Sequence, residues 1–177
     1  MAFLTPLLTI IATIIVLFLL LALIVKKDFT LEKEIVINQP KATVFDFIKL
    51  IRNQEQYSVW ILRDPNIKII YTGTDGTVGF KSSWTSEDKN VGVGEQEIIK
   101  IEEGESIETE IRFKKPFEAV NYGRTTVIAL DTNRTKVSNL FYGRSKFPMN
   151  IMNIFMDKLV GKDMQQNLVN LKKKLEA

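Results

Sequence analysis

The sequence predicts an α+β protein, in which a curved antiparallel sheet wraps around a long C-terminal helix and one transmembrane helix precedes the sheet. Three observations support this fold class. The first 25 residues carry no charged side chain, the middle of the chain consists of short strand-like segments between polar turns, and residues 148–176 return to helical spacing. We therefore expect a transmembrane anchor with a basic flank at residues 1–27 and a single domain at residues 28–177.

The N-terminal segment has the length of a membrane-spanning helix. At about 1.5 Å per residue, the uncharged stretch from Ala2 to Val25 makes a helix of about 36 Å, longer than a hydrocarbon core of about 30 Å. The alternative is a cleavable signal, which has a basic start, an apolar run of about 7–15 residues and small residues before the cleavage site. This stretch has no basic start and ends in Leu-Ile-Val, which favours the anchor.

The flanking charges predict how the anchor is oriented. Lys26 and Lys27 follow the apolar stretch directly, and no charge precedes it, although Asp28 offsets part of the basic signal. Positive charge next to a spanning helix tends to stay in the cytoplasm. We therefore expect a single-pass protein of the cell membrane whose domain lies on the cytoplasmic side.

The composition narrows the possible functions. The 24 basic and 21 acidic residues give a net charge of only +3, which is typical of a mixed surface and predicts no nucleic-acid partner. Cys and His are both absent. Their absence excludes disulfides, thiolate metal sites, a cysteine nucleophile and a Ser-His-Asp triad. Without a glycine-rich phosphate loop either, the sequence predicts no metal and no cofactor.

The domain begins with a strand and a helix. In the segment FTLEKEIVIN apolar residues alternate with polar ones, as in a half-buried strand. We expect Asn38 to cap the following helix, in which an early Pro40 is tolerated because first-turn amides have no intrahelical partner. Residues 41–53 show an apolar face at helical spacing, formed by Val44, Phe47, Ile48 and Ile51.

Six short strands follow a second short helix, which is expected in QEQYSVWILRDPN with Asp64 and Pro65 forming its final turn. The tight polar turns between the strands imply an antiparallel meander. The expected strands are Ile67–Thr72, Val78–Thr85, Val93–Glu102, Ser106–Lys114, Ala119–Leu130 and Thr135–Tyr142.

The C-terminal residues 148–176 predict one long helix with a core-facing apolar stripe. The concave side of the meander is the simplest surface to cover this stripe. The stripe consists of Met152, Phe155, Leu159, Met164, Leu168, Leu171 and Leu175.

Five stretches of this domain are distinctive: PKATVFDFIKLIRN, YSVWILRDPNIKIIYTG, TVGFKSSWTSEDKNVGVGEQEI, IETEIRFKKPFEA and FMDKLVGKDMQQNLVNLKKKLE. Together they resemble the SRPBCC superfamily, in its polyketide cyclase/dehydrase-like (START-like, Bet v 1-like) branch. The resemblance implies a helix-grip fold with a cavity between sheet and long helix that holds a lipid, sterol, polyketide or other apolar molecule. The chain departs from the family pattern at Asn139 and at residues 165–167, so the resemblance does not fix the ligand.

Strand alternation predicts which residues face this cavity. From Ile107 to Phe113 the odd-numbered residues form the apolar face, and extending the alternation to the neighbouring strands gives further inward positions. These are Glu97, Ile99 and Ile101, then Asn121, Thr125 and Val127, then Val137, Asn139 and Phe141. Three polar residues thus lie on an apolar wall, where polar groups orient a small ligand. A register error of one residue would turn each of them outward.

The candidate ligand-binding residues are these three polar residues and four aromatic ones expected at the mouth: Tyr57, Trp60, Trp84, Glu97, Asn121, Asn139 and Tyr142. Glu97 is also the candidate acid or base, because burial raises the pKa of a carboxyl group. Ordinary core packing is the alternative for each aromatic residue.

The leading interpretation is a membrane-anchored protein that binds a hydrophobic small molecule or lipid. A polyketide cyclase/dehydrase-like enzyme, implied by the resemblance, is one alternative. A module at the membrane that interacts only with other proteins is another.

Overall fold

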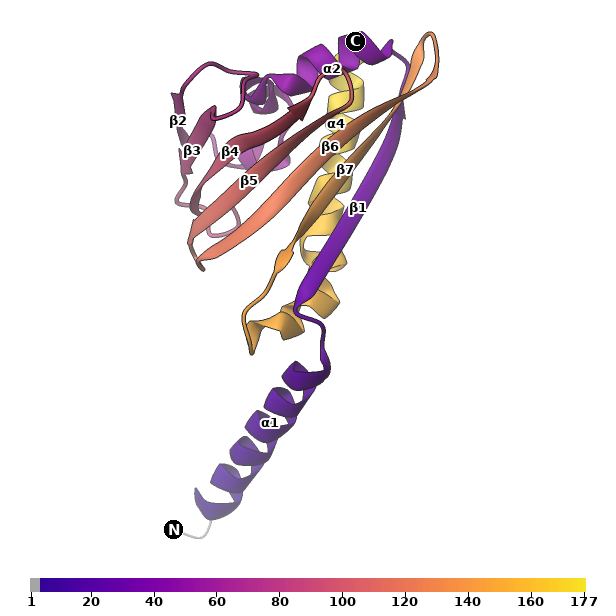
Figure 1. The fold of residues 1–177 in the computed structure, drawn as a ribbon. Helices are drawn as coiled ribbons and strands as arrows, with labels where there is room; N and C mark the ends of the chain where they lie inside the picture. The colour runs from indigo at the N-terminus through magenta and orange to yellow at the C-terminus, as the bar shows by residue number, and fades with distance from the viewer. Residues whose placement is uncertain (1–3) are drawn as a thin grey trace.

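The computed structural model describes residues 4–177 and contains a seven-stranded antiparallel sheet with a helix packed behind it (Figure 1). The order of the strands is β1-β7-β6-β5-β4-β3-β2, so that β1 closes the meander by pairing with β7. The strands are β1 (Asp28–Ile37), β2 (Lys68–Thr72), β3 (Lys81–Thr85), β4 (Val93–Glu102), β5 (Ser106–Lys115), β6 (Ala119–Asp131) and β7 (Arg134–Arg144). The predicted antiparallel meander and α+β class are confirmed.

Helix α1 (Leu4–Ile24) projects away from the sheet, and nearly all of its apolar side chains are exposed (Figure 1). By length and composition it is able to cross a membrane, but a signal sequence near the N-terminus has the same properties. The helix alone is therefore weak evidence for an anchor. Residues 1–3 of the expected anchor lie outside the described residues.

The hydrophobic core lies between the concave face of the sheet and two helices, α2 (Lys41–Lys49) and α4 (Lys162–Leu175). The predicted face of the first helix is confirmed, with Val44, Ile48 and Ile51 buried and Phe47 partly buried. The largest fully buried apolar side chains are Phe45, Phe80, Ile37, Ile98, Leu168, Leu171, Val44, Val127 and Val137.

Two helix boundaries differ from the prediction. Helix α2 ends at Lys49 because Leu50 is extended, and a 3-10 helix, η1 (Ile51–Gln56), follows. The Asp75 carboxylate accepts the backbone N–H of Ile51 at 2.8 Å and so caps η1. Asn38 is not a helix cap, since α2 starts after Pro40 without a side-chain cap and the Asn38 N–H donates to Glu176. The predicted short helix is α3 (Val59–Arg63).

The C-terminal helical region has three parts instead of one continuous α-helix: η2, a 3-10 helix (Met149–Phe155), η3, a π-helix (Asp157–Gly161), and α4. The apolar stripe expected along its whole length is buried only in α4, at Met164, Leu168 and Leu171. Met152, Phe155 and Leu159 are 40%, 49% and 53% exposed. The prediction that these three belong to the core is wrong. Met152 and Phe155 are part of η2, which extends beyond the edge of the sheet (Figure 1), and Leu159 is part of η3.

Candidate functional site

A cavity of about 620 Å³ lies between the concave face of the sheet, α3 and the start of α4. Its walls are largely apolar and aromatic, with polar groups at intervals. The lining residues from the sheet side are Ile67, Ile69, Ser82, Trp84, Asn90, Val91, Gln96, Ile111, Phe113, Gly123, Thr125, Asn139 and Phe141. Those from the helical side are Gln54, Tyr57, Ser58, Trp60, Ile61, Arg63, Leu159, Val160, Asp163, Met164 and Asn167.

Four of the seven predicted site residues line this cavity, namely Tyr57, Trp60, Trp84 and Asn139. Trp84 is held by two contacts: its indole N–H donates to the Val91 carbonyl at 3.2 Å, and its ring meets Phe113 edge-on at 5.9 Å. The aromatic part of the wall is thus fixed by neighbouring strands. The other three predicted residues, Glu97, Asn121 and Tyr142, are outside the lining.

Glu97 lies on the outer face of the sheet, and the prediction that it faces the cavity is wrong. Strand β4 has an irregularity between Ile98 and Lys100, where Ile98 pairs with Thr109 and Lys100 with Glu108. Ile99 is the extra residue of this β-bulge, and an extra residue reverses the alternation of faces behind it. After the bulge, Ile101 points inward as expected. Before the bulge, the inward residues are Gln96 and Ile98. Glu97 and Ile99, which were expected to face inward, do not.

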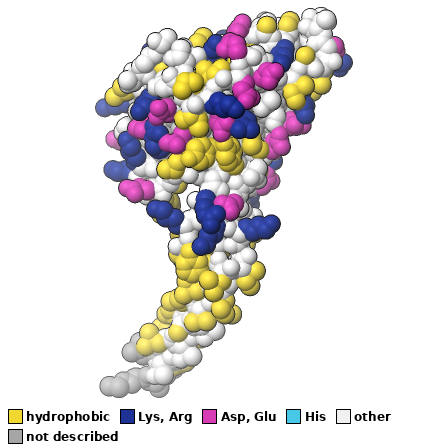
Figure 2. Space-filling view, viewed as in Figure 1, with side chains coloured by type: hydrophobic (Ala, Val, Ile, Leu, Met, Phe, Trp, Pro, Cys, Tyr) yellow, Lys and Arg dark blue, Asp and Glu magenta, His cyan; other side chains and the backbone are white. Residues whose placement is uncertain are grey.

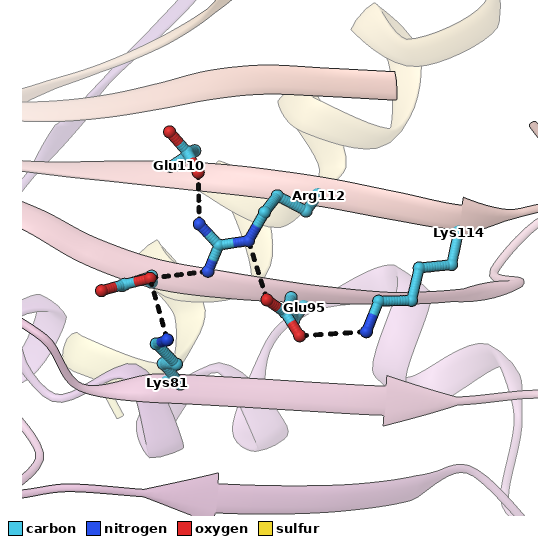
Figure 3. Close-up of polar contacts among 6 residues, drawn as sticks. Lys81, Glu95, Glu110, Arg112 and Lys114 are labelled. Atoms are coloured by element: carbon cyan, nitrogen blue, oxygen red, sulfur yellow. Dashed lines mark hydrogen bonds and ion pairs between the residues drawn. The ribbon is translucent and has the colours of Figure 1, made fainter. Parts of the chain in front are cut away.

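On the outer face Glu97 belongs to a charged network around Arg112. Figure 3 labels Arg112 and four further members of this network. The Arg112 guanidinium donates to Glu97 at 2.6 Å, to Glu95 at 2.7 Å and also to Glu110. Lys81 and Lys114 flank the network, at 3.4 Å from Glu97 and 3.1 Å from Glu95. The hydrogen bond from Arg112 lowers the pKa of Glu97, contrary to the expected rise. Glu97 is therefore an ionised structural residue and not the candidate acid or base.

Tyr142 is also on the outer face. Its hydroxyl donates to Glu108, which receives a second hydrogen bond from Arg124 at 2.6 Å. The Tyr142 ring stacks on Tyr122 from the neighbouring strand, with ring centroids 5.4 Å apart. The odd-numbered residues of β7 face inward, so an even-numbered tyrosine next to Asn139 and Phe141 points outward.

Asn121 faces inward, in agreement with its predicted register, but lies beyond the end of the cavity. It pairs with Gly143 of β7, and a Cβ atom at Gly143 would meet the Asn121 side-chain oxygen at 2.3 Å. The amide therefore lies directly over Gly143, which only glycine permits at so close an approach.

The polar groups of the cavity differ in whether the protein satisfies them. Gln96 donates to Gln54 at 2.8 Å, and the Asn167 side-chain oxygen accepts the Val59 N–H at 2.7 Å. Asn139 and Thr125 are direct cross-strand partners on the inner face, and neither side chain has a hydrogen bond within residues 4–177. These two groups are left to bind water or a ligand.

Three ionisable side chains line the described cavity. Arg63 and Asp163 form an ion pair at 2.9 Å that joins α3 to α4. Burial raises the pKa of Tyr57, so its phenol is protonated at neutral pH and is available as a donor. Within residues 4–177 there is no cluster of three His, Cys, Asp or Glu side chains that could hold a metal. The arrangement is suited to enclosing an apolar molecule and orienting it by neutral hydrogen bonds.

Sequence reasoning missed Gln54, Gln96, Arg63, Asp163 and Asn167 as lining residues. Helical spacing could have identified Asn167, because it lies on the buried side of α4 with Met164, Leu168 and Leu171. Gln96 depends on the bulge in β4, for which the sequence carries no glycine or proline signal.

Comparison with known proteins agrees with this architecture. The aromatase/cyclase Zhui from Streptomyces sp. R1128 superimposes with a TM-score of 0.63 at 10% identity, over 84% of this chain and 94% of the other. Ara h 8.0201 superimposes with a TM-score of 0.52 at 18% identity, over 81% of this chain and 98% of the other. The protein TTHA0849 from Thermus thermophilus superimposes with a TM-score of 0.58 at 13% identity, over 82% of this chain and 96% of the other.

Identities this low establish the helix-grip fold alone. No curated protein matches the sequence. A family model does match, over residues 28–176, and it describes polyketide cyclases/dehydrases and lipid transport proteins. Because the match spans the sheet, the cavity and the C-terminal helix, this chain belongs to the polyketide cyclase/dehydrase and lipid transport family.

Proposed function

We propose that the protein binds a hydrophobic small molecule or lipid in the cavity while α1 anchors it in the cell membrane. The observation that carries this proposal is the pair Asn139 and Thr125. Their side chains line the largely apolar wall of a cavity of about 620 Å³ and have no hydrogen-bond partner among residues 4–177. Ligand cavities of proteins have volumes of about 300–1,000 Å³ and use a few such groups for orientation.

The anchor is consistent with this use of the cavity. Residues 1–27 would hold the domain, residues 28–177, on the cytoplasmic side of the bilayer in which apolar ligands dissolve. Tethering raises the effective concentration of the domain near such ligands without any new contact. The exposed apolar surface of α1 supports an anchor, because in water it would remain uncovered.

A cyclase or dehydrase activity is the second candidate, favoured by the family description and by the aromatase/cyclase named above. In this chain Asp163 is neutralised by Arg63, and Tyr57 is a protonated phenol that cannot act as a base at neutral pH. Glu97, the acid or base expected from the sequence, is on the outer face. These positions favour binding over acid–base catalysis.

Native mass spectrometry of the full chain, extracted from membranes in mild detergent, tests both parts of the proposal. We expect an intact mass that includes residues 1–27 and a discrete additional mass of an apolar molecule, which solvent extraction then identifies. Asn139→Leu should lower ligand occupancy roughly tenfold, because a hydrogen bond to a buried ligand contributes about 1–2 kcal/mol. Asn121→Leu, inward but outside the cavity, is the matched control and should bind as the wild type does.

The two parts of the proposal fail separately. A chain that has lost its first residues by cleavage would contradict the anchor. A wild-type chain that carries nothing, and takes up nothing from a panel of fatty acids, phospholipids and aromatic polyketides, would contradict the binding function. Equal loss of binding in Asn121→Leu and Asn139→Leu would contradict the assignment to this cavity.

A further inference from the structure

The 3-10 helix η2 has its polar and apolar faces reversed relative to a helix in water. Its three-residue turn separates two faces. On the inner side Asn150 is fully buried, Ile151 is 7% exposed and Asn153 is partly buried, whereas the outward side chains are all apolar and 40–55% exposed. These outward side chains, which we call the η2 face, are Met149, Met152, Ile154 and Phe155. Helix α4, only a few residues further along the chain, buries its leucines and exposes its lysines in the usual way.

These two asparagines attach η2 to the last turn of α1 and to the three residues that follow it. The Asn150 amide donates to the carbonyls of Ala22 and Val25 at 2.7 and 2.8 Å. The Asn153 amide donates to the carbonyls of Lys26 and Lys27 at 3.0 and 2.9 Å. These carbonyls have no partner in α1 itself, because the helix ends there. The two asparagines therefore fix η2 at the level of the C-terminal turn of α1 (Figure 1).

The charges around this junction are unbalanced towards positive. Figure 2 shows Lys and Arg side chains gathered where the apolar surface of α1 meets the domain. The nearby acids are already paired, Asp28 with Arg144 at 2.9 Å and Asp157 with Lys33 at 2.6 Å. Lys26, Lys27 and Lys146 are exposed, and none of them forms an ion pair within the described residues 4–177.

From these three observations we propose that the η2 face lies in the interface of an anionic lipid bilayer, as a second membrane contact beside α1. This inference rests on the anchor in the proposed function. If α1 spans the bilayer, its last turn is at the boundary between acyl chains and headgroups, and η2 is held at the same depth. The η2 face then enters the acyl region while Lys26, Lys27 and Lys146 contact acidic headgroups.

Contact between the η2 face and the bilayer also determines which side of the cavity lies next to the membrane. Leu159 lies one helical turn after Phe155, is 53% exposed, and lines the cavity. An apolar surface therefore leads from the η2 face to the cavity wall. With two points of attachment the domain cannot rotate freely about the end of α1, and this side of the cavity stays next to the bilayer.

Site-directed spin labelling of the full chain tests the proposal, and the absence of native cysteine makes every introduced cysteine unique. We would label Met152→Cys and Ile154→Cys with a nitroxide and reconstitute the chain in vesicles of phosphatidylcholine mixed with phosphatidylserine. Depth is measured as the ratio of collision rates with oxygen and with a water-soluble nickel chelate. Leu23→Cys in α1 and Ile70→Cys, exposed on β2, are the two controls.

We expect a collision ratio several-fold higher at positions 152 and 154 than at position 70, approaching that at position 23. In vesicles of phosphatidylcholine alone the ratio at 152 and 154 should fall, whereas at 23 it should not change. A lipid-like label at 23 with water-like labels at 152 and 154 would overturn this inference and leave the anchor intact. Water-like labels at all positions would overturn the anchor. A second copy of the chain on the η2 face would bring two labels at position 152 close together and broaden the spectrum by dipolar coupling. Broadening that disappears when labelled chain is mixed with unlabelled chain would show such a copy, and would also overturn the inference.

Discussion

The polar side chains on the two faces of the sheet differ in whether they have partners. On the outer face Arg112 contacts three glutamates, and Glu108 accepts hydrogen bonds from both Arg124 and Tyr142. On the inner face Asn139 and Thr125 lie side by side without a side-chain hydrogen bond in the described chain. The outer face thus has far more charge, but the charges of these networks are paired, whereas the side chains of Asn139 and Thr125 on the inner face have no hydrogen-bond partner among residues 4–177.

This contrast indicates where function is located. A polar group on a largely apolar wall costs free energy unless something binds it, whereas a paired surface charge contributes little either way. The inner pair is therefore better evidence for a ligand than the much larger outer network. The outer network connects three neighbouring strands, because Arg112 of β5 contacts glutamates of β4, one of which also contacts Lys81 of β3 (Figure 3).

The strongest test of the two faces compares adjacent residues at the bulge. Ile98 is 1% exposed and belongs to the core, while Ile99 is 37% exposed on the bulge. We expect Ile98→Ala to lower the free energy of unfolding by about 2–5 kcal/mol, through lost burial and the cavity left behind. Ile99→Ala should lower it by about 0.5 kcal/mol or less. Urea unfolding of the full chain in mild detergent measures both, followed by the fluorescence of Trp60 and Trp84. A larger cost for Ile99→Ala than for Ile98→Ala would mean that Ile99 and Glu97 face inward, and would contradict the bulge in β4.

The same bulge shows how far the sequence predicts this fold. The strands, the meander and the closing helix follow from local patterns, since alternation and turn residues act within a few positions. Local patterns do not predict which face a residue occupies beyond an irregularity in the strand, because one extra residue reverses the face of every residue after it. Alternation was correct for the inward positions predicted in β5, β6 and β7, over which the pairing is continuous. It failed in β4 at Glu97 and Ile99.

The C-terminal helical region shows a second limit of prediction from the sequence. Met152 and Leu168 both belong to the apolar stripe predicted for residues 148–176, yet Leu168 is 2% exposed and Met152 is 40% exposed. Periodicity identifies which side chains share a face, but what covers that face depends on the tertiary structure. The available signal in the sequence was the pair Asn150 and Asn153, which are three residues apart and interrupt the apolar stripe at the spacing of one 3-10 turn.

A smaller effect is expected from the centre of the outer network. Arg112→Met should lower the free energy of unfolding at neutral pH by about 1–2 kcal/mol, because it leaves three partly buried carboxylates without their shared donor. Ligand occupancy should not change, since Arg112 does not line the cavity. A large loss of binding would contradict the separation of the two faces.

The pH dependence gives this variant a distinct signature. Hydrogen bonds from Arg112 hold the folded-state pKa values of Glu95 and Glu97 below the ordinary value of 4.5. Their contribution to stability is therefore fully present above pH 4.5 and is lost as the pH falls through the lower folded-state values. The difference between wild type and Arg112→Met should be largest at neutral pH and shrink below pH 4.5. A difference that stays constant with pH would mean that Arg112 stabilises the sheet by packing alone.

The smallest effect is expected from Lys114, which contacts the same Glu95 but has a side chain that is 60% exposed, against 27% for Arg112. Lys114→Met should change the free energy of unfolding by about 0.5 kcal/mol or less, because water and salt already screen an exposed ion pair. Concentrated salt should abolish even this difference, while most of the Arg112→Met difference persists. Urea unfolding of the two variants at low and high salt measures both effects. If Lys114→Met proved as costly as Arg112→Met, the outer network would depend on net charge and not on the half-buried hydrogen bonds of Arg112. In that case the charges on the outer face would also not be fully compensated. The difference between the partnered polar groups outside and the unpartnered ones inside would then no longer be evidence for a ligand in the cavity.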